Sequence, residues 1–579
     1  MSAISSRTGC RAAAPWASVP CRWARASRSS AGPTRPNNAR GSCRCRPRLG
    51  PPEFCGEHQR TAKRGSQGRG CARPATEGTN KGDTMMGKRV RSLVLSLMMT
   101  AVPVAALAQG APVPEIAGPI LGPVTTPHSI TLNGKTVRYT ATFAEKVLTD
   151  ATGKPLASIS ATAYVASPVV KTRPVLFVFN GGPGASSSPL HFGAFGPRSI
   201  VKGADGNRML ADNPHSLLAD ADLVFIDPVS TGFSRVLPGG DGHPYWNADG
   251  DAQAVLGLIR DWLRDQGRTG SPVYIAGESY GGFRLATMMK FVGDLPIAGL
   301  ILISPALDFT AVAENPGNDL PHIFELPAMA VTAWKHGRAK IDAQTPDQVF
   351  QVAADYAEGP YALALLKGGQ LPAAERDAVA ARLGDLIGLP AKTIADANLR
   401  IGTQTFLETL LADQGLVVGR LDGRVTGPVP KDAPADRPAA AKDPALGLGR
   451  TNVITSSVAT DYFKHELNVP VGRDYVSLTL DVNFSWNFQP AKREDGFYVN
   501  AAPDIAPVMK AQPGTRLLLV GGYYDMAVPL LSARYAIDRA GIPLDRVTVA
   551  AFDAGHSPFD GEAGQVRMRE MMHGFLVGR

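Results

Sequence analysis

The stretch SPVYIAGESYGGFRLATMMKFV, Ser271–Val292, decides the fold of this chain. An apolar run leads into Gly-Glu-Ser-Tyr-Gly, and a run of good helix formers follows. In a nucleophile elbow, a serine occupies a tight turn between a strand and a helix, and glycines two residues to either side let the helix fold back. With 61 glycines in 579 residues such a pentapeptide arises readily by chance, so the flanking strand and helix patterns carry the argument. They predict that Ser279 is an exposed nucleophile.

Short apolar runs recur along the chain and alternate with helical patterns. PVLFVFN, ADLVFID, PVYIAG, GLILIS, RLLLVGG and RVTVAAF are almost continuously apolar, which is typical of strands buried on both faces by helices. Upstream, HSITLNGKTVRYTATFAEKVLT and PLASISATAYVAS alternate, which predicts antiparallel strands with a turn at Asn133-Gly134. The whole pattern predicts an α/β fold with a mostly parallel central sheet flanked by helices. The rhythm is lost over 310–490, which we expect to be a largely helical cap inserted between two parts of the sheet domain, 109–309 and 491–579.

The first 108 residues differ in composition from the rest. Residues 1–84 carry 16 Lys and Arg against 4 Asp and Glu without apolar periodicity, so we expect a disordered, non-native upstream extension. Residues 85–108 have a basic head, an apolar stretch and small residues before an expected cleavage after Ala108, as in a secretory signal peptide. Because such signals begin a chain, Met85 or Met86 is the expected start, and the alternative is a genuine basic arm or a long targeting tail. The sequence therefore predicts an exported protein, either periplasmic or secreted.

The composition of the exported part narrows the possible partners. The whole chain has a net charge of +9, but residues 109–579 carry 41 Lys and Arg against 47 Asp and Glu and contain no cysteine. We therefore expect no nucleic-acid partner and no disulfides. We also expect no stable membrane anchor, because no apolar stretch after the signal is long enough to span a bilayer and no cysteine follows the cleavage site. No phosphate-binding loop is present, Cys43 and Cys45 lie outside the exported part, and we expect neither metal nor cofactor.

A serine nucleophile in such a sheet requires an acid and then a histidine, each beyond a later strand. RLLLVGGYYDMAVP places Asp525 after one apolar run, and RVTVAAFDAGHSPF places His556 after the next. The histidine would take the proton of Ser279, and the acid would hold the ring in the required tautomer. Asp553 and His573 are the alternatives. We favour Asp525 because strand-end loops carry the chemistry in open α/β sheets, and His573 falls in a predicted helix.

A second glycine-rich segment, FVFNGGPGASSSPLHFGAFGP, follows another apolar run. Glycines at the end of a strand let backbone amides approach a substrate closely, as donors to a developing oxyanion must. The amide of the residue after the nucleophile, Tyr280, is the second expected donor. The sequence thus predicts an oxyanion hole built from two separate strand ends.

Several of these motifs, in this order, resemble the serine carboxypeptidase family (peptidase family S10), and we identify the chain as similar to an exported, bacterial-type member. The matching stretches are NGGPGASSS from Asn180, NPHSLLADADLVFIDPVSTGFS from Asn213, GESYGG from Gly277, GGYYDMAVP from Gly521 and GH at Gly555-His556. The resemblance implies an α/β-hydrolase fold and release of C-terminal amino acids.

The resemblance also implies roles for individual residues. Ser279, Asp525 and His556 would form the catalytic triad, and the amides of Gly182 and Tyr280 would form the oxyanion hole. Asn180 and Glu278 would bind the terminal carboxylate of the substrate. The cysteine usual after NGGPG is Ala185 here, and Ala194 stands at about the position of a second glutamate that many members carry.

Two other classes of function stay open at this point. An esterase or acyltransferase on the same scaffold would act on a small acyl substrate, and only a carboxypeptidase requires a free C-terminal carboxylate. A non-catalytic binding protein would lack a reactive serine, which a fluorophosphonate probe detects. The function that the sequence favours is a serine carboxypeptidase that hydrolyses the C-terminal bonds of peptides through an acyl-enzyme intermediate.

Overall fold

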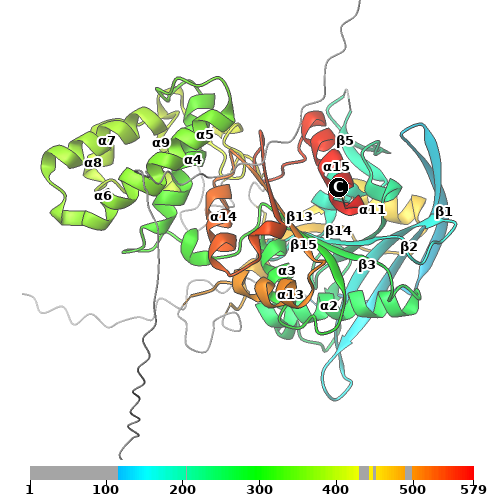
Figure 1. Ribbon diagram of the computed structural model, residues 1–579. Helices are drawn as coiled ribbons and strands as arrows, with labels where there is room; N and C mark the ends of the chain where they lie inside the picture. The colour runs from blue at the N-terminus through cyan, green and yellow to red at the C-terminus, as the bar shows by residue number, and fades with distance from the viewer. Residues whose placement is uncertain (1–114, 204, 430–442, 447–450, 489–497, 579) are drawn as a thin grey trace, which may run out of the picture. The chain divides into compact units, whose positions relative to one another are not determined.

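The computed structural model describes residues 115–203, 205–429, 443–446, 451–488 and 498–578. The expectations for an extension at 1–84 and a signal peptide at 85–108 lie outside these residues. A ten-stranded sheet forms the centre (Figure 1). Within the described ranges, no helix combines the length and apolar character needed to span a bilayer. The strand order is β1 (Val124–Leu132), β2 (Lys135–Thr149), β3 (Pro155–Ser167), β7 (Asp222–Asp227), β4 (Val175–Phe179), β9 (Val273–Glu278), β10 (Ile297–Ile303), β15 (Arg516–Gly522) and β16 (Val547–Phe552), with β8 (Arg235–Val236) beside β3.

The direction of the strands follows the two sequence patterns. The alternating segments form the antiparallel strands β1 to β3, and the turn between β1 and β2 is at Asn133-Gly134, where both residues have positive φ (51° and 73°). The continuously apolar runs form β7, β4, β9, β10, β15 and β16, which pair in parallel. This mostly parallel sheet with helices around it is an α/β-hydrolase fold, and the predicted fold class is confirmed.

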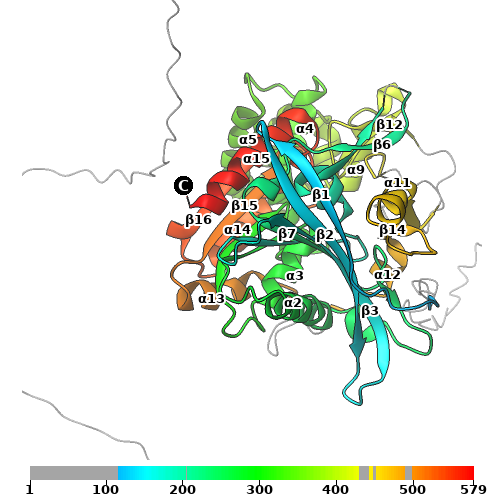
Figure 2. The same ribbon diagram turned by 90° about the vertical axis from the view of Figure 1, so that its right-hand side faces the viewer.

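Helices cover both faces of the parallel strands. Because successive side chains of a strand point to opposite faces, each strand contributes to a separate core on each face. On one face Phe177, Ile275 and Leu302 pack in one core with α2 (Ala248–Asp265), α3 (Tyr280–Met288), α13 (Ile505–Ala511) and α14 (Leu530–Arg539). On the other face Leu176 and Ile301 pack in a second core with α15 (Glu562–Val577). Figure 1 shows α15 on the opposite side of the sheet from α2, α3 and α13, and in Figure 2 the long strands β1 and β2 cross in front.

Most of the remaining elements lie in the chain between β10 and β15, which pair as neighbours. Part of this insertion packs into the core of the sheet: Tyr462, Phe463 and Tyr475 contact the aromatic rings of Phe192 and Phe233. The insertion thus contributes both a helical lobe and a segment of the sheet domain. Its elements are α4 (Leu320–Lys335), α5 (Pro346–Tyr356), α6 (Ala362–Lys367), α7 (Ala373–Ile387), α8 (Ala391–Asp396), α9 (Thr403–Thr409), β11 (Leu416–Val418), β12 (Thr426–Pro428), β13 (Val453–Ser456), α11 (Ser457–Asp461), β14 (Tyr475–Thr479) and α12 (Leu480–Phe484).

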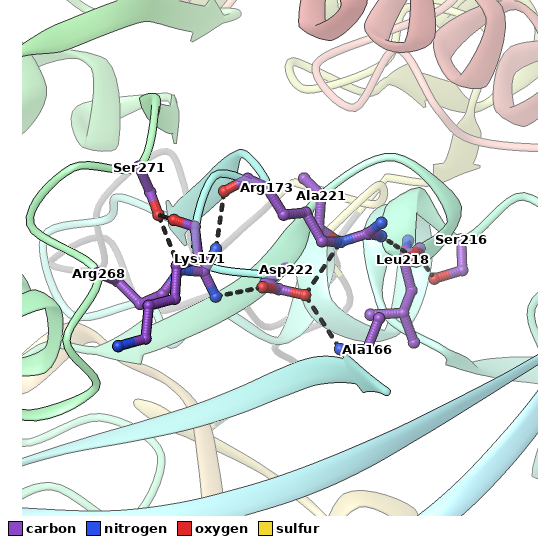
Figure 3. Close-up of polar contacts among 9 residues, drawn as sticks. All are labelled: Ala166, Lys171, Arg173, Ser216, Leu218, Ala221, Asp222, Arg268 and Ser271. Carbon is purple, nitrogen blue, oxygen red and sulfur yellow. Dashed lines mark hydrogen bonds and ion pairs between the residues drawn. The ribbon is translucent and has the colours of Figure 1, made fainter. Parts of the chain in front are cut away.

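A buried ionic cluster ties together the amino ends of β4, β7 and β9 (Figure 3). The carboxylate of Asp222 accepts hydrogen bonds from Arg173 (3.1 Å), Arg268 (2.5 Å) and the amide of Ala166 (3.0 Å). Arg268 also donates to Ser271 at 2.7 Å. Removing one partner of such a buried group typically costs about 3–5 kcal/mol, because it leaves an uncompensated charge. The cluster thus anchors the ends of these strands that lie away from the predicted nucleophile.

Candidate active site

Ser279 lies in a strained turn between β9 and α3. Its backbone angles, φ 62° and ψ −127°, fall in a region that residues other than glycine rarely adopt. The amide of Ser279 donates to the Ile303 carbonyl at 2.9 Å, which continues the pairing of β9 with β10. A Cβ at Gly277 would lie 2.3 Å from the Gly281 carbonyl oxygen, and a Cβ at Gly281 would lie 3.0 Å from the Phe179 carbonyl oxygen. Gly277 is therefore needed for the helix to fold back over the strand, and Gly281 lets the helix lie close to the end of β4.

Asp525 and His556 come together at the carboxyl ends of the next strands. Asp525 follows β15, His556 follows β16, and Nδ1 of His556 lies 2.8 Å from Oδ2 of Asp525. Oδ1 of Asp525 accepts the amides of Ala527 at 2.9 Å and Val528 at 3.1 Å, and the carboxylate is 1% exposed. Because these amides hold the carboxylate in place, Oδ2 is presented to the imidazole as an acceptor.

The rival acid and histidine lie elsewhere. His573 belongs to α15, where its Nδ1 lies 2.9 Å from the carboxylate of Asp220. Asp553 is exposed, and its backbone carbonyl accepts a hydrogen bond from Arg424 at 2.8 Å. The imidazole that Asp525 contacts is therefore that of His556, the histidine that the sequence favours.

The charges around His556 favour its protonated form. Burial lowers the pKa of the imidazole, but the charge and hydrogen bond of Asp525 and the charge of Glu278 raise it more, so the net direction is upward. Arg420 acts in the opposite sense and lowers the pKa of His556. An imidazole held by a carboxylate in this way is suited to accept a proton from a nucleophile.

A cavity of about 1130 Å³ opens beside the strained turn. It is large enough for a peptide end or an acyl substrate of moderate size. Asp525 stands behind His556 and is not part of the lining. Six of the seven residues that the sequence singled out line the cavity: Asn180, Gly182, Glu278, Ser279, Tyr280 and His556.

The glycine-rich segment after β4 lies against the start of α3. A Cβ at Gly181 would lie 2.4 Å from the amide nitrogen of Tyr280, so only glycine permits this approach. Gly182 has φ 100°, a conformation that favours glycine. The segments that carry the amides of Gly182 and Tyr280 are therefore in direct contact beside Ser279, which is the arrangement that two convergent oxyanion donors need.

Arg284 holds these two segments together, and the sequence analysis did not single it out. It lies in α3, is fully buried and donates to the backbone carbonyl of Asn180. Its Nε donates to Asp251 of α2 at 2.6 Å, and its guanidinium lies over the rings of Phe179 and Tyr280. A cation bonded to a carbonyl, a carboxylate and two ring faces fixes the glycine-rich segment relative to α3.

Glu278 and Asn180 form a buried pair beside the nucleophile. The side-chain amide of Asn180 donates to Oε2 of Glu278, and the hydroxyl of Ser557 donates to Oε1 at 2.8 Å. Burial raises the pKa of Glu278 to about 7, partly offset by His556 and by these hydrogen bonds, whereas Asp560 raises it further. Near neutral pH this carboxyl is therefore populated in both its protonated and its ionised form.

Two further residues of the cavity lining, Ser557 and Arg420, were not singled out from the sequence. Ser557 directly follows His556, and that adjacency was a usable signal. Arg420 lies in the insertion, in a stretch without any motif, so nothing in the sequence connects it with Ser279.

A family model matches the part of the chain that carries the glycine-rich segment and the strained turn. The family model described as serine carboxypeptidase matches residues 163–294, which include Asn180, Gly182 and Ser279. Among curated proteins, the chain is 29% identical over 159 residues to "Serine carboxypeptidase-like 38" of Arabidopsis thaliana, covering 25% of this chain and 31% of that protein. It is 39% identical over 111 residues to "Carboxypeptidase Y" of Saccharomyces cerevisiae, covering 19% and 20%.

The matched stretch thus spans less than a third of the length of these curated relatives. The stretch that the family model matches, 163–294, contains the glycine-rich segment and the strained turn, but it ends before Asp525, His556 and the insertion. Among solved structures, a prohormone-processing carboxypeptidase of Saccharomyces cerevisiae superposes with a TM-score of 0.44 at 14% identity, covering 79% of this chain and 94% of that one.

Proposed function

We propose that this protein hydrolyses the C-terminal peptide bond of peptides. The match of residues 163–294 to the serine carboxypeptidase family model supports the proposal. One observation carries the proposal. The cavity beside Ser279 and His556 also contains the buried pair of Asn180 and Glu278, which can donate hydrogen bonds to a terminal carboxylate. A protonated acid next to the nucleophile can donate to a free C-terminal carboxylate, a contact that an ester substrate cannot use.

In the proposed reaction, Oγ of Ser279 attacks the carbonyl carbon of the last peptide bond. Nε2 of His556 accepts the serine proton and donates it to the leaving amino group, while Asp525 accepts a hydrogen bond from Nδ1–H and stabilises the imidazolium. The amides of Gly182 and Tyr280 donate to the oxyanion of the tetrahedral intermediate. The terminal amino acid leaves, and water then hydrolyses the acyl-enzyme by the same proton transfers in reverse order.

The terminal carboxylate determines the protonation state that the site needs. Two ionised carboxylates at hydrogen-bond distance repel, so Glu278 must be protonated to donate to the substrate. His556 must be neutral to accept the serine proton. The productive form therefore carries a single proton for this pair, on Glu278, and the two groups titrate as a coupled pair.

This coupling gives the experiment that tests the function. For a peptide with a free C-terminus, we expect kcat/KM to rise with pH as His556 loses its proton. It should then fall by about ten-fold per pH unit above the pKa of Glu278, which is about 7. In Glu278→Gln the alkaline fall should vanish, because glutamine keeps a donor and does not ionise. Its acid limb should also move to lower pH, because the Glu278 charge that raises the pKa of His556 is gone.

The measurement is a pH series of kcat/KM for both enzymes on matched peptide acids and amides, with released residues identified by mass spectrometry. The wild type should shorten the acid by one residue at a time and should prefer it strongly over the amide below pH 7. Ester substrates serve as a control and should show the rising limb alone, since they bring no carboxylate to Glu278. Superimposable profiles for the two enzymes, or equal turnover of acid and amide, would favour an esterase instead.

We also propose that the protein is exported by a signal peptide at 85–108. The basic head, apolar stretch and small residues of that segment support export. N-terminal sequencing of protein recovered from the periplasm or the medium should find Gln109 or an adjacent residue at the start. Recovery of the exported protein with residues 85–108 still attached would contradict cleavage at this site.

A further inference from the structure

The insertion places a cationic side chain, that of Arg420, in the lining of the active-site cavity. Its segment is hydrogen-bonded to both loops that carry the triad candidates. The amide of Met526, next to Asp525, donates to the Arg420 carbonyl at 3.0 Å, and the amide of His556 donates to the Leu421 carbonyl at 2.7 Å. The backbone at Arg420 is thus fixed relative to the imidazole by contacts on either side.

Neighbouring contacts hold the same segment from further directions. The amide of Leu421 donates to Oδ2 of Asp443 at 2.8 Å, and the amide of Gly423 donates to the Tyr524 carbonyl at 3.0 Å. A Cβ at Gly555 would lie 2.6 Å from the Leu421 carbonyl oxygen, so the two segments are in direct contact. A residue held this firmly at a cavity wall can contribute a preorganised contact to a ligand.

The guanidinium of Arg420 uses few of its N–H donors in hydrogen bonds within the described part of the chain. It donates from Nη2 to the Ala527 carbonyl at 3.3 Å, a long hydrogen bond. Among the residues that the structure describes, no carboxylate lies within ion-pairing distance of it, in contrast to Arg424 four residues on, which pairs with Asp422 at 2.7 Å. A guanidinium carries five N–H donors in a planar fork that matches a carboxylate. Burial raises the pKa of Glu325, which the charge of Arg420 partly offsets, but Glu325 is not an ion-pair partner of Arg420, so most of this capacity has no carboxylate partner in the described part of the chain.

The other charged groups of the lining favour an anionic ligand as well. Lys202 and Arg208 also line the cavity, whereas the acid Asp443 already accepts the amides of Leu421 and Ala445. The pair of Asn180 and Glu278 offers neutral donors when Glu278 is protonated. A positive charge at Arg420 would complement these neutral donors, because a carboxylate bound by a cation is held more strongly than one bound by neutral groups alone.

We infer that Arg420 is a specificity-determining residue that binds a carboxylate of the substrate. This inference rests on the proposed peptidase function. The carboxylate is either the terminal one or that of an acidic side chain on the terminal residue, and the chemistry of recognition is the same in both cases. The insertion would then select substrates directly, through a residue placed in the cavity.

Arg420 also acts on His556, whose pKa it lowers, so its removal changes catalysis for every substrate. The test therefore compares matched substrates at one pH, where an effect on His556 cancels in their ratio. The first pair is a peptide ending in leucine as the free acid or the amide. The second pair is a peptide acid ending in aspartate or asparagine.

Arg420→Met keeps the apolar stem and removes the charge. We expect it to lower kcat/KM for the carboxylate-bearing member of one pair by about 10- to 100-fold relative to its neutral partner, mainly through KM. A changed acid-to-amide ratio identifies the terminal carboxylate, and a changed aspartate-to-asparagine ratio identifies the side chain. Arg420→Lys should restore part of the loss, because it keeps the charge without the fork.

Arg424→Met is the matched control, because it removes a cation from the same segment but not from the cavity lining. Both ratios should remain at the wild-type values in this variant. Labelling of Ser279 by a fluorophosphonate establishes that each variant is folded. An equal loss on all four peptides in Arg420→Met, or no loss on any, would overturn the inference. If instead the labelled wild type releases no residue from any peptide, the proposed peptidase function fails and not the role of Arg420 alone.

Discussion

Ser279→Ala is expected to lower kcat by about 10⁶-fold and to abolish labelling by a fluorophosphonate. The hydroxyl is the atom that would form the acyl-enzyme, and the strained backbone of Ser279 (φ 62°) points to a position kept for function. Residual turnover should stay above that of the uncatalysed reaction, because the amides of Gly182 and Tyr280 and the substrate contacts persist. The loss should therefore lie in kcat, with KM changed little.

The measurement is single-turnover and steady-state hydrolysis of a peptide acid, with labelling followed by intact-protein mass spectrometry. Ser477→Ala is the matched control, because Ser477 contributes another hydroxyl to the same cavity lining. We expect it to change kcat by less than about ten-fold. Undiminished hydrolysis by Ser279→Ala, or labelling of a different serine, would refute the assignment of the nucleophile and with it the proposed mechanism.

The fold was predictable because its signals are local. Each continuously apolar run, such as PVLFVF or RLLLVGG, formed a parallel strand, since only strands covered on both faces by helices need such runs. The turn at Asn133-Gly134 formed for an equally local reason, because both residues tolerate positive φ. The division of the insertion was not predictable in this way: Tyr462 and Phe463 pack into the sheet core through aromatic contacts with residues far away in the sequence.

Some residues of the candidate site could likewise be predicted from the sequence, and others could not. Ser279, Asp525 and His556 each follow a strand, and parallel strands bring their carboxyl ends to one edge, so the meeting of these residues follows from topology. Arg284 gave no such signal, because its partners Asp251 and the Asn180 carbonyl are known only once α2 and α3 are packed. Arg420 depends on where the insertion touches the His556 loop. The sequence therefore did not predict contacts between segments that are far apart along the chain.

Asp525→Asn is expected to lower kcat by about 10⁴-fold, the second largest effect. The amide carbonyl can still accept the amides of Ala527 and Val528, as Oδ1 of the carboxylate does. The side-chain NH₂ would then face Nδ1 of His556 in place of Oδ2, so donor meets donor unless the imidazole changes tautomer. In the other tautomer Nε2 carries the proton and cannot accept one from Ser279.

Because the backbone contacts of Asp525 survive in the variant, the loss should appear in activity and much less in stability. Asp553→Asn is the control, since Asp553 is the rival acid in the same part of the chain and is exposed. We expect that variant to keep wild-type kcat, and both proteins to unfold within a few degrees of the wild type in a thermal melt.

Kinetics and melting curves for the wild type and the two variants show which acid acts with His556. If Asp553→Asn carries the large loss and Asp525→Asn retains activity, the imidazole takes its orientation from a different acid than the 2.8 Å contact indicates. If instead both asparagine variants are fully active, neither carboxylate orients His556, and the assignment of a triad of serine, acid and histidine would be wrong.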